Sequence, residues 1–205
     1  MPLPLADCRR CARFRHQFKK LRLEFPDYWN QPVPAVGDQK SPLMILGLAP
    51  GKHGANRTGV PFTGDASGEL LFSTLRQLNL QDSVVITNAV KCLPINNKPA
   101  STEINNCQRY LTPEVQDHLR KSCSTFLALG RVAHNALLKA LGVRQVDHPF
   151  VHGGDHELPD AVRIVDSYHC SRYNTQTGRL TAAMFHDAVA KAAVLAGLRE
   201  GVPSV

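Results

Sequence analysis

Hydrophobic residues gather in four short, almost unbroken runs along the chain. These runs cover residues 42–48, 83–88, 125–129 and 162–167, and several of their side chains are β-branched. Near-continuous hydrophobicity, in place of alternation with polar residues, is typical of strands that are buried on both faces of a parallel sheet. The four runs therefore predict a central four-stranded parallel sheet.

Stretches with apolar positions at helical spacing lie between and after these runs. They cover residues 68–78, 102–121, 132–141 and 181–198. Strands that alternate with helices in this way predict a three-layer α/β/α fold with right-handed crossovers. Residues 147–160 are rich in Pro, Gly and His, which predicts a long surface loop.

The composition is that of an ordinary globular protein, with 205 residues, 43% hydrophobic and 20% charged. This length suits one domain over residues 1–205, which we expect to act as a monomer. No apolar run approaches membrane-spanning length, and the first residues lack the apolar core of a signal peptide. We therefore expect a cytoplasmic protein without a membrane partner.

The net charge of +7 and the isoelectric point near 9.3 favour a polyanionic partner such as nucleic acid. Part of the excess is local, because residues 1–25 carry seven cationic and two acidic side chains. A DNA contact and a solvated basic helix face explain this cluster about equally well. Aromatic residues make up only 6% of the chain, which argues against a platform for stacking single-stranded bases.

Four cysteines form a pattern that ordinary folding does not need. Cys8 and Cys11 form a C-x-x-C pair, while Cys92 and Cys107 are separated by fourteen residues. Four thiolates from distant segments can hold a zinc ion or an iron–sulfur cluster. Zinc sites of this kind usually combine two C-x-x-C pairs, so the spacing favours a [4Fe–4S] cluster and leaves zinc open. A disulfide is disfavoured in a chain without export signals.

Other cysteines and histidines carry weaker signals. Cys123 and Cys170 are expected to be inert, the first as part of the core. His148, His152 and His156 suggest a metal site, but their spacing is irregular. We expect His152 to line the substrate pocket as a secondary candidate.

Polar and glycine-rich motifs follow three of the predicted strands, at residues 47–65, 88–92 and 169–174. Parallel α/β sheets bind ligands beyond the carboxyl ends of their strands, so these motifs predict one composite site. The glycine spacing in the first motif does not fit a nucleotide-binding P-loop, and no Ser or Thr follows its lysine.

Three segments resemble those of the uracil-DNA glycosylase superfamily. They are residues 47–51 (Gly-Leu-Ala-Pro-Gly), 56–65 (Asn-Arg-Thr-Gly-Val-Pro-Phe-Thr-Gly-Asp) and 169–181, which begin His-Cys-Ser-Arg-Tyr-Asn. The chain is most similar to the iron–sulfur type B branch, or family 5, from Cys8 to about Thr181. The resemblance implies an enzyme that flips uracil, and other deaminated bases such as hypoxanthine, out of double-stranded DNA. It then hydrolyses the N-glycosidic bond and leaves an abasic site.

The resemblance also implies roles for single residues. His169 would be catalytic, donating to O2 of the departing base, and Phe62 would stack on that base. Substrate contacts are expected from Gly47, Ala49, Gly51, Phe62, Asn88 and Asn174. DNA contacts are expected from Ser171, Arg172 and Tyr173. The four cysteines would hold a structural [4Fe–4S] cluster. Asn88 can equally pair with N3–H and O4 of uracil or brace its loop, and Phe62 outside this motif would be an ordinary core residue.

One departure from the superfamily concerns the residue that holds the attacking water. Other branches have Asp, Asn or Glu in the first motif, where this chain has Leu48 and Ala49. Asp65 is the nearest remaining carboxylate, and we expect it to be catalytic. It is also well placed to cap the following helix, and the two roles are compatible. The departure leaves a rival hypothesis, a non-catalytic iron–sulfur protein that binds DNA. A zinc or redox regulator would explain the cysteines but not the other motifs.

Overall fold

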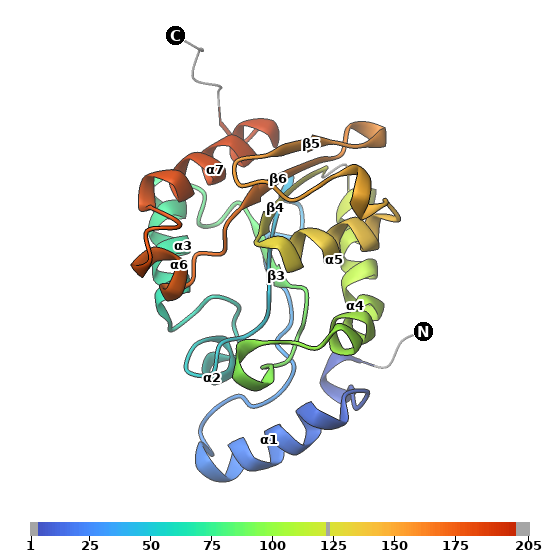
Figure 1. The fold of residues 1–205 in the computed structure, drawn as a ribbon, viewed down its shortest axis with the longest axis vertical. Coiled ribbons are helices and arrows are strands. Elements are labelled where there is room, and N and C mark those ends of the chain that lie inside the picture. Colours follow the sequence, from blue (N-terminus) through green and yellow to red (C-terminus); the bar gives the residue numbers. More distant parts are fainter. Residues whose placement is uncertain (1–3, 122–123, 200–205) are drawn as a thin grey trace.

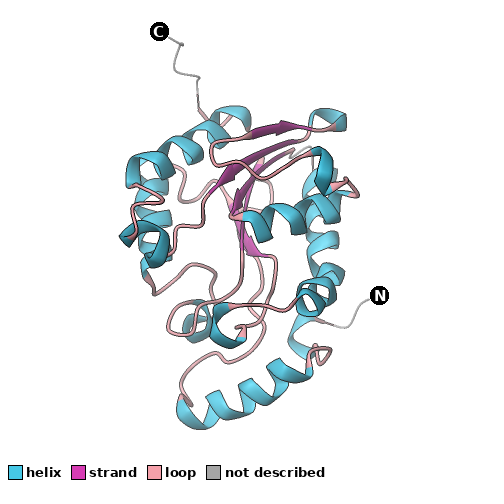
Figure 2. Ribbon diagram, viewed as in Figure 1, coloured by secondary structure: helices cyan, strands magenta, loops and turns pink. Residues whose placement is uncertain are grey.

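A mixed sheet of six strands runs through the described residues of the computed structural model, which are 4–121 and 124–199 (Figures 1 and 2). The strands are β1 (Val36–Gly37), β2 (Leu43–Gly47), β3 (Val85–Asn88), β4 (Thr125–Leu129), β5 (Asp155–Glu157) and β6 (Arg163–Ser167). Their order is β1-β3-β2-β4-β6-β5. Neighbours among β3, β2, β4 and β6 run parallel, and β1 and β5 add antiparallel strands at the two edges.

The four parallel strands are the four predicted from the hydrophobic runs, so that part of the fold is confirmed. All residues of β2, β3 and β4 are buried, as strands covered on both faces require. The two edge strands were not predicted, and the sheet is mixed instead of wholly parallel. β5 also corrects the loop expected over residues 147–160. Its three residues are all polar, so no hydrophobic pattern predicts it. The strand forms because its backbone pairs with β6.

Helices cover both faces of the sheet. They are α1 (Ala12–Glu24), α2 (Ala55–Thr58), α3 (Ala66–Gln77), α4 (Ser101–Arg120), α5 (Arg131–Leu141), α6 (Arg172–Gln176) and α7 (Ala182–Leu195), with short 3₁₀ turns η1 (Leu5–Asp7), η2 (Ile95–Asn97), η3 (Gln145–Asp147) and η4 (Pro159–Ala161). α3 and α7 pack on one face, while α4 and α5 pack on the other (Figure 1). This is the expected three-layer arrangement.

The side chains of β2 point alternately to the two helix layers and pack in both hydrophobic cores. Leu43 and Ile45 pack with the helices α3 and α7, and Met44 and Leu46 pack with α4 and α5. Because successive side chains of a strand point to opposite faces, a strand that is apolar throughout joins two separate cores.

Helix α1 lies outside these layers and forms a third hydrophobic cluster (Figure 1). Its buried side chains are Phe14, Phe18 and Leu21, while its arginines and lysines are exposed. The basic residues of α1 therefore lie on its solvent side, while Arg9 and Arg10 precede the helix.

Two other expectations concern particular parts of the chain. None of the described helices combines the length and apolar character needed to cross a membrane. Cys123, expected in the core, lies outside the described residues.

Candidate active site and cysteine site

An open cavity of about 840 Å³ lies where the parallel strands end. Its walls come from four segments, at residues 48–67, 88–98, 129–132 and 169–173. Each segment follows or ends one of the strands β2, β3, β4 and β6. The cavity therefore has the position that a parallel α/β sheet offers to a ligand, and it brings together motifs that are far apart in sequence.

Asp65 lies on the cavity wall and also caps helix α3. Its Oδ1 accepts a hydrogen bond from the backbone N–H of Gly68, at 3.0 Å. Its Oδ2 faces Gly51 and Gly54, and a Cβ atom on Gly51 would come within 2.7 Å of that oxygen. The two glycines thus leave room for a carboxylate oxygen that the cap does not use. This division allows both roles that the sequence leaves open.

Phe62 presents its ring to the cavity from a strained backbone position. Its φ of 55° lies in the left-handed region that non-glycine residues rarely adopt. Its ring packs over Gly47, where a Cβ atom would come within 2.5 Å of it. The ring is nearly parallel to the imidazole of His169, with an interplanar angle of 25° and centroids 6.0 Å apart. A flat aromatic wall therefore adjoins a polar ring.

His169 follows β6, lines the cavity and has one unsatisfied ring nitrogen. Its Nδ1 is buried and has no hydrogen-bond partner among the described residues. Burial lowers the pKa of His169 to about 4, although the charge of Asp65 acts in the opposite direction. The imidazole is thus neutral near pH 7. A neutral ring with one free nitrogen can serve a ligand as a donor or an acceptor.

Asn88 is the last residue of β3 and supplies a second unsatisfied polar atom. Its Oδ1 is buried without a hydrogen-bond partner in the described part of the chain, and the residue lines the cavity. A buried amide without partners is costly, which favours a site prepared for a polar ligand. A Cβ atom on Gly47 would come within 2.4 Å of this oxygen, so Asn88 also packs against the end of β2.

Ser171, Arg172 and Tyr173 lie together on the cavity wall. The Ser171 hydroxyl caps α6 by accepting from the backbone N–H of Asn174. Arg172 and Tyr173 point outward, and the Tyr173 side chain is 71% exposed. A short capped helix thus carries a cation and an aromatic ring at the cavity mouth.

The other sequence-predicted residues divide into two groups. Ala49 and Gly51 line the cavity, whereas Gly47 and Asn174 do not. Gly47 makes room for the Phe62 ring, and the Asn174 side-chain amide donates to the carbonyl oxygen of His169 at 2.8 Å. These two residues support the site from behind, instead of reaching into it as we expected.

His152 lies elsewhere. Its ring stacks on Tyr168 with centroids 4.8 Å apart, and its Nδ1 accepts from the Tyr168 backbone N–H. The secondary prediction that it lines the pocket is therefore wrong.

Several cavity residues were not predicted from the sequence. They include Lys52, Asn96, Asn97, Lys98 and Arg131. The consecutive asparagines have φ angles of 53° and 55°, and Asn is the residue that best tolerates this left-handed conformation. An Asn-Asn pair before Lys-Pro was thus the available signal for a turn. No sequence feature marked the three cations Lys52, Lys98 and Arg131 as cavity residues.

The four predicted cluster ligands come from three separate segments and meet beside α1. Cys8 and Cys11 precede that helix, Cys92 follows β3 and Cys107 lies within α4. Cys92 and Cys107 are buried, in the same hydrophobic cluster as Phe14 of α1. The thiols are close enough that their charges affect one another.

Burial raises the pKa of the Cys107 thiol to about 11, with neighbouring cysteines adding to the shift. The pKa of Cys92 is raised for the same reasons. As thiolates these buried or half-buried groups would repel one another, and a bound metal would offset that repulsion. This donor set suits an iron–sulfur cluster or zinc.

A buried lysine adjoins the cysteine site. Lys91 is fully buried, and its Nζ contacts Glu114 Oε2 at 2.6 Å and Thr87 Oγ1 at 2.5 Å. Its charge and backbone hydrogen bond favour the thiolate form of Cys107. A fixed cation therefore offsets part of the negative charge that thiolate ligands bring.

Cys170 is buried and separate from these ligands. Burial raises the pKa of its thiol to about 12, and its Sγ lies 3.5 Å from the carbonyl oxygen of Ser67. A thiol in this environment is inert, as the sequence suggested.

Comparison with known proteins gives consistent results. A family model described as the uracil DNA glycosylase superfamily matches residues 34–193. A type-5 uracil-DNA glycosylase of Thermus thermophilus is 42% identical, over 95% of this chain and 96% of that protein. A type-5 uracil-DNA glycosylase of Pyrobaculum aerophilum is 39% identical, over 94% and 91% of the two chains. A type-4 uracil-DNA glycosylase of Archaeoglobus fulgidus is 31% identical, over 67% and 69%.

Proposed function

The chain belongs to the uracil-DNA glycosylase superfamily, in its type 5 branch, and we propose that it hydrolyses the N-glycosidic bond of uracil in double-stranded DNA. The observation that carries the proposal is the convergence of an aromatic ring, two unsatisfied polar atoms and a carboxylate on one cavity. These groups belong to Phe62, Asn88, His169 and Asp65. They are the groups that this reaction needs.

Binding begins with a base that leaves the duplex, because the glycosidic bond is inaccessible within the stack. The Phe62 ring offers a face on which the flipped base stacks. The Asn88 amide then pairs with the base edge, its free Oδ1 accepting N3–H and its amino group donating to O4. Thymine offers the same edge, so its exclusion has to come from shape around the C5 position.

The departing base carries negative charge as the bond breaks. His169 stabilises this charge by donating a hydrogen bond to O2 of the base. Its lowered pKa keeps the ring neutral near pH 7. It therefore acts as an oriented donor, and no proton has to be removed before the reaction. A preorganised donor of this kind is worth roughly 2.7–4 kcal/mol in the transition state.

The sugar develops positive charge as the base leaves, and water must attack it. Asp65 offers its free Oδ2 for both tasks, orienting the water and opposing the oxocarbenium charge. The backbone N–H of Gly68 binds Oδ1 and so fixes the carboxylate, while Oδ2 stays available for the reaction. Leu48 and Ala49, where other branches have the polar residue, therefore do not deprive the site of a carboxylate.

Cations near the cavity mouth would hold the DNA backbone. Arg172, Lys98 and Arg131 are exposed there, beside the Tyr173 ring that would fill the space of the flipped base. Phosphate contacts of this kind weaken steeply as salt concentration rises. We therefore expect the affinity for duplex DNA to fall strongly between low and moderate salt.

Cys8, Cys11, Cys92 and Cys107 would hold a [4Fe–4S] cluster with a structural role, tying α1 to the segments around Cys92 and Cys107. The sequence spacing supports the cluster over zinc, because only one of the two cysteine pairs has the C-x-x-C form and the other pair is separated by fourteen residues. Iron and sulfide analysis of the purified protein distinguishes the two.

The substrate range should extend to hypoxanthine and other altered bases. Ala49 and Gly51 have small side chains on the cavity wall, and the cavity volume of about 840 Å³ leaves space for a purine. A panel of duplexes, each with one altered base, measures this range. Release of uracil alone would contradict it. The cytoplasmic location and the monomeric state expected from the sequence remain predictions.

The test of the proposed function is a single-turnover assay on a labelled duplex that contains one uracil. Alkaline treatment cuts the strand wherever a base has been removed. We expect cutting at uracil and none in the matched duplex with thymine. Tight DNA binding without any abasic product would favour the non-catalytic DNA-binding protein instead.

A further inference from the structure

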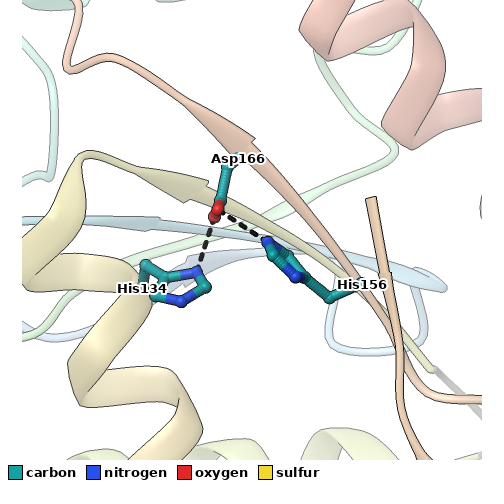
Figure 3. A group of neighbouring side chains, drawn as sticks. All are labelled: His134, His156 and Asp166. Carbon is teal, nitrogen blue, oxygen red and sulfur yellow. Dashed lines mark hydrogen bonds and ion pairs between the residues drawn. The ribbon is translucent and has the colours of Figure 1, made fainter. Parts of the chain in front are cut away.

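Two histidines and an aspartate form a polar cluster away from the cavity (Figure 3). His134 lies on α5, His156 on β5 and Asp166 on β6. None of the three lines the proposed active site. Their ligand atoms all lie within 4.8 Å of one another, and His134 and Asp166 are fully buried.

Sheet geometry explains why these three side chains meet. His156 is paired with Ile164 across the antiparallel β5–β6 ladder, and Asp166 is two residues further along β6. Residues two apart on a strand share a face, and so do residues paired across a ladder. His156, Ile164 and Asp166 therefore point to the same side of the sheet. Ile164 packs with α5 residues on that side, where α5 also carries His134.

The hydrogen bonds identify which nitrogen of His134 faces the carboxylate. Its Nε2 lies 2.8 Å from the carbonyl oxygen of His148, and a carbonyl can only accept, so Nε2 carries a hydrogen. Its Nδ1 lies 2.7 Å from Asp166 Oδ1, while His156 Nε2 lies 2.9 Å from Asp166 Oδ2. Two imidazole nitrogens therefore point at the two oxygens of one buried carboxylate. Because His134 Nε2 already carries a hydrogen, the short contact between its Nδ1 and Asp166 Oδ1 needs a second hydrogen or a metal ion between the two atoms. His156 meets its own contact in either state, as an N–H donor or as a metal ligand.

We propose that His134, His156 and Asp166 bind Zn²⁺. Two imidazole nitrogens and a carboxylate oxygen are a common zinc donor set, and solvent supplies the fourth ligand past His156, which is 12% exposed. The outer contacts of such a site are already present. His134 donates its other N–H to a backbone carbonyl, and Asp166 Oδ2 accepts from the Val151 backbone N–H at 3.3 Å. Metal-binding histidines and carboxylates are held in this way.

This zinc would join α5, β5 and β6 at the edge of the sheet, and its ligand Asp166 lies three residues before His169, which follows β6. Its binding displaces the protons that otherwise lie between the nitrogens and the carboxylate. The proposal does not depend on the glycosylase activity, because its readout is metal binding alone.

The test uses the purified full-length protein with whatever its cysteines already hold. Equilibrium dialysis against Zn²⁺, followed by elemental analysis, should find one zinc per chain that is absent from His156→Gln. Loss of an outer-shell partner typically weakens a metal site about 10–100-fold, so loss of a ligand should exceed this. The control is His186→Gln, the same change at a histidine of α7 that is not in the cluster; it should bind zinc like the wild type.

A second measurement remains decisive if His156→Gln does not fold. Co²⁺ added to the wild-type protein should give the weak visible bands of nitrogen and oxygen ligands, without the intense near-ultraviolet absorption of thiolate ligands. Three results would each overturn the proposal: no Zn²⁺ uptake by the wild type, equal uptake by a folded His156→Gln, or a purely thiolate Co²⁺ spectrum. Protons would then be what joins the two histidines to the aspartate.

Discussion

Substitution of Asp65 separates its two roles, because each of its oxygens has a different environment. Oδ1 accepts from the Gly68 backbone N–H, and Oδ2 faces the glycine-lined wall of the cavity. Asp65→Asn keeps an oxygen that can cap α3 and removes the charge. Asp65→Ala removes both the cap and the charge.

Stability should follow the cap. Asn and Asp cap helices about equally well, whereas Ala costs about 1 kcal/mol. For a protein of this size, 1 kcal/mol corresponds to a decrease of roughly 2–4 °C in melting temperature. We therefore expect Asp65→Asn to melt close to the wild type and Asp65→Ala to melt a few degrees lower.

Activity should follow the charge. A positioned general base typically contributes about 10²–10⁴-fold to the rate. Both variants lack the carboxylate, so base release should fall at least about 100-fold in each. That factor is about 2.7 kcal/mol of activation free energy. The two variants should thus differ in stability and agree in rate.

The assay is single-turnover release of uracil, with thermal unfolding measured on the same preparations. Thr181→Ala is the matched control, because Thr181 caps α7 by accepting from the Met184 backbone N–H and does not line the cavity. It should lose stability and keep its rate. A wild-type rate for a folded Asp65→Asn would refute the catalytic role and leave Asp65 as a helix cap.

Further predictions concern the imidazole, the cysteines and the packing of the cavity wall. His169→Ala should slow single-turnover base release about 10²–10³-fold with little change in folding; a rate near the wild type would assign the ring to loop structure. Because the pKa of His169 is about 4 and its ordinary value is 6.5, the folded state binds this proton more weakly than the unfolded chain. Stability should thus fall as pH drops from about 6.5 towards 4, while the rate, measured at each pH, should show no decrease centred near 6.5. Cys92→Ser should lose iron and sulfide, measured chemically, whereas Cys170→Ser should retain both. Gly47→Ala should weaken substrate binding, seen as a raised KM, because its methyl group would displace the aromatic ring beside it.

The central fold was predictable because burial leaves a mark on the sequence. Strands covered on both faces form short runs that are mostly apolar, which identified the four parallel strands. β1 and β5 have two and three residues, and β5 is polar. Their place in the sheet depends on a partner strand, and single-sequence patterns do not contain that information. Edge strands were missed for this reason.

The site was predictable to the extent that its groups stand in motifs after strands. Asp65, Phe62 and His169 belong to such motifs and line one cavity. Lys98 lies in the loop after η2 and Arg131 begins α5, and neither belongs to a motif, so they were missed. The grouping of His156 with two residues from other elements was missed as well, because irregular spacing in sequence becomes proximity only through the β5–β6 register.

The segment between β3 and α4 adjoins both the cysteine site and the cavity. Its beginning carries Cys92, its middle lines the cavity at Pro94 and Asn96, and the helix that follows carries Cys107. The proposed cluster would therefore also fix the position of part of the cavity wall. Its loss should displace Pro94 and Asn96, and so weaken substrate binding, without any change in the sheet.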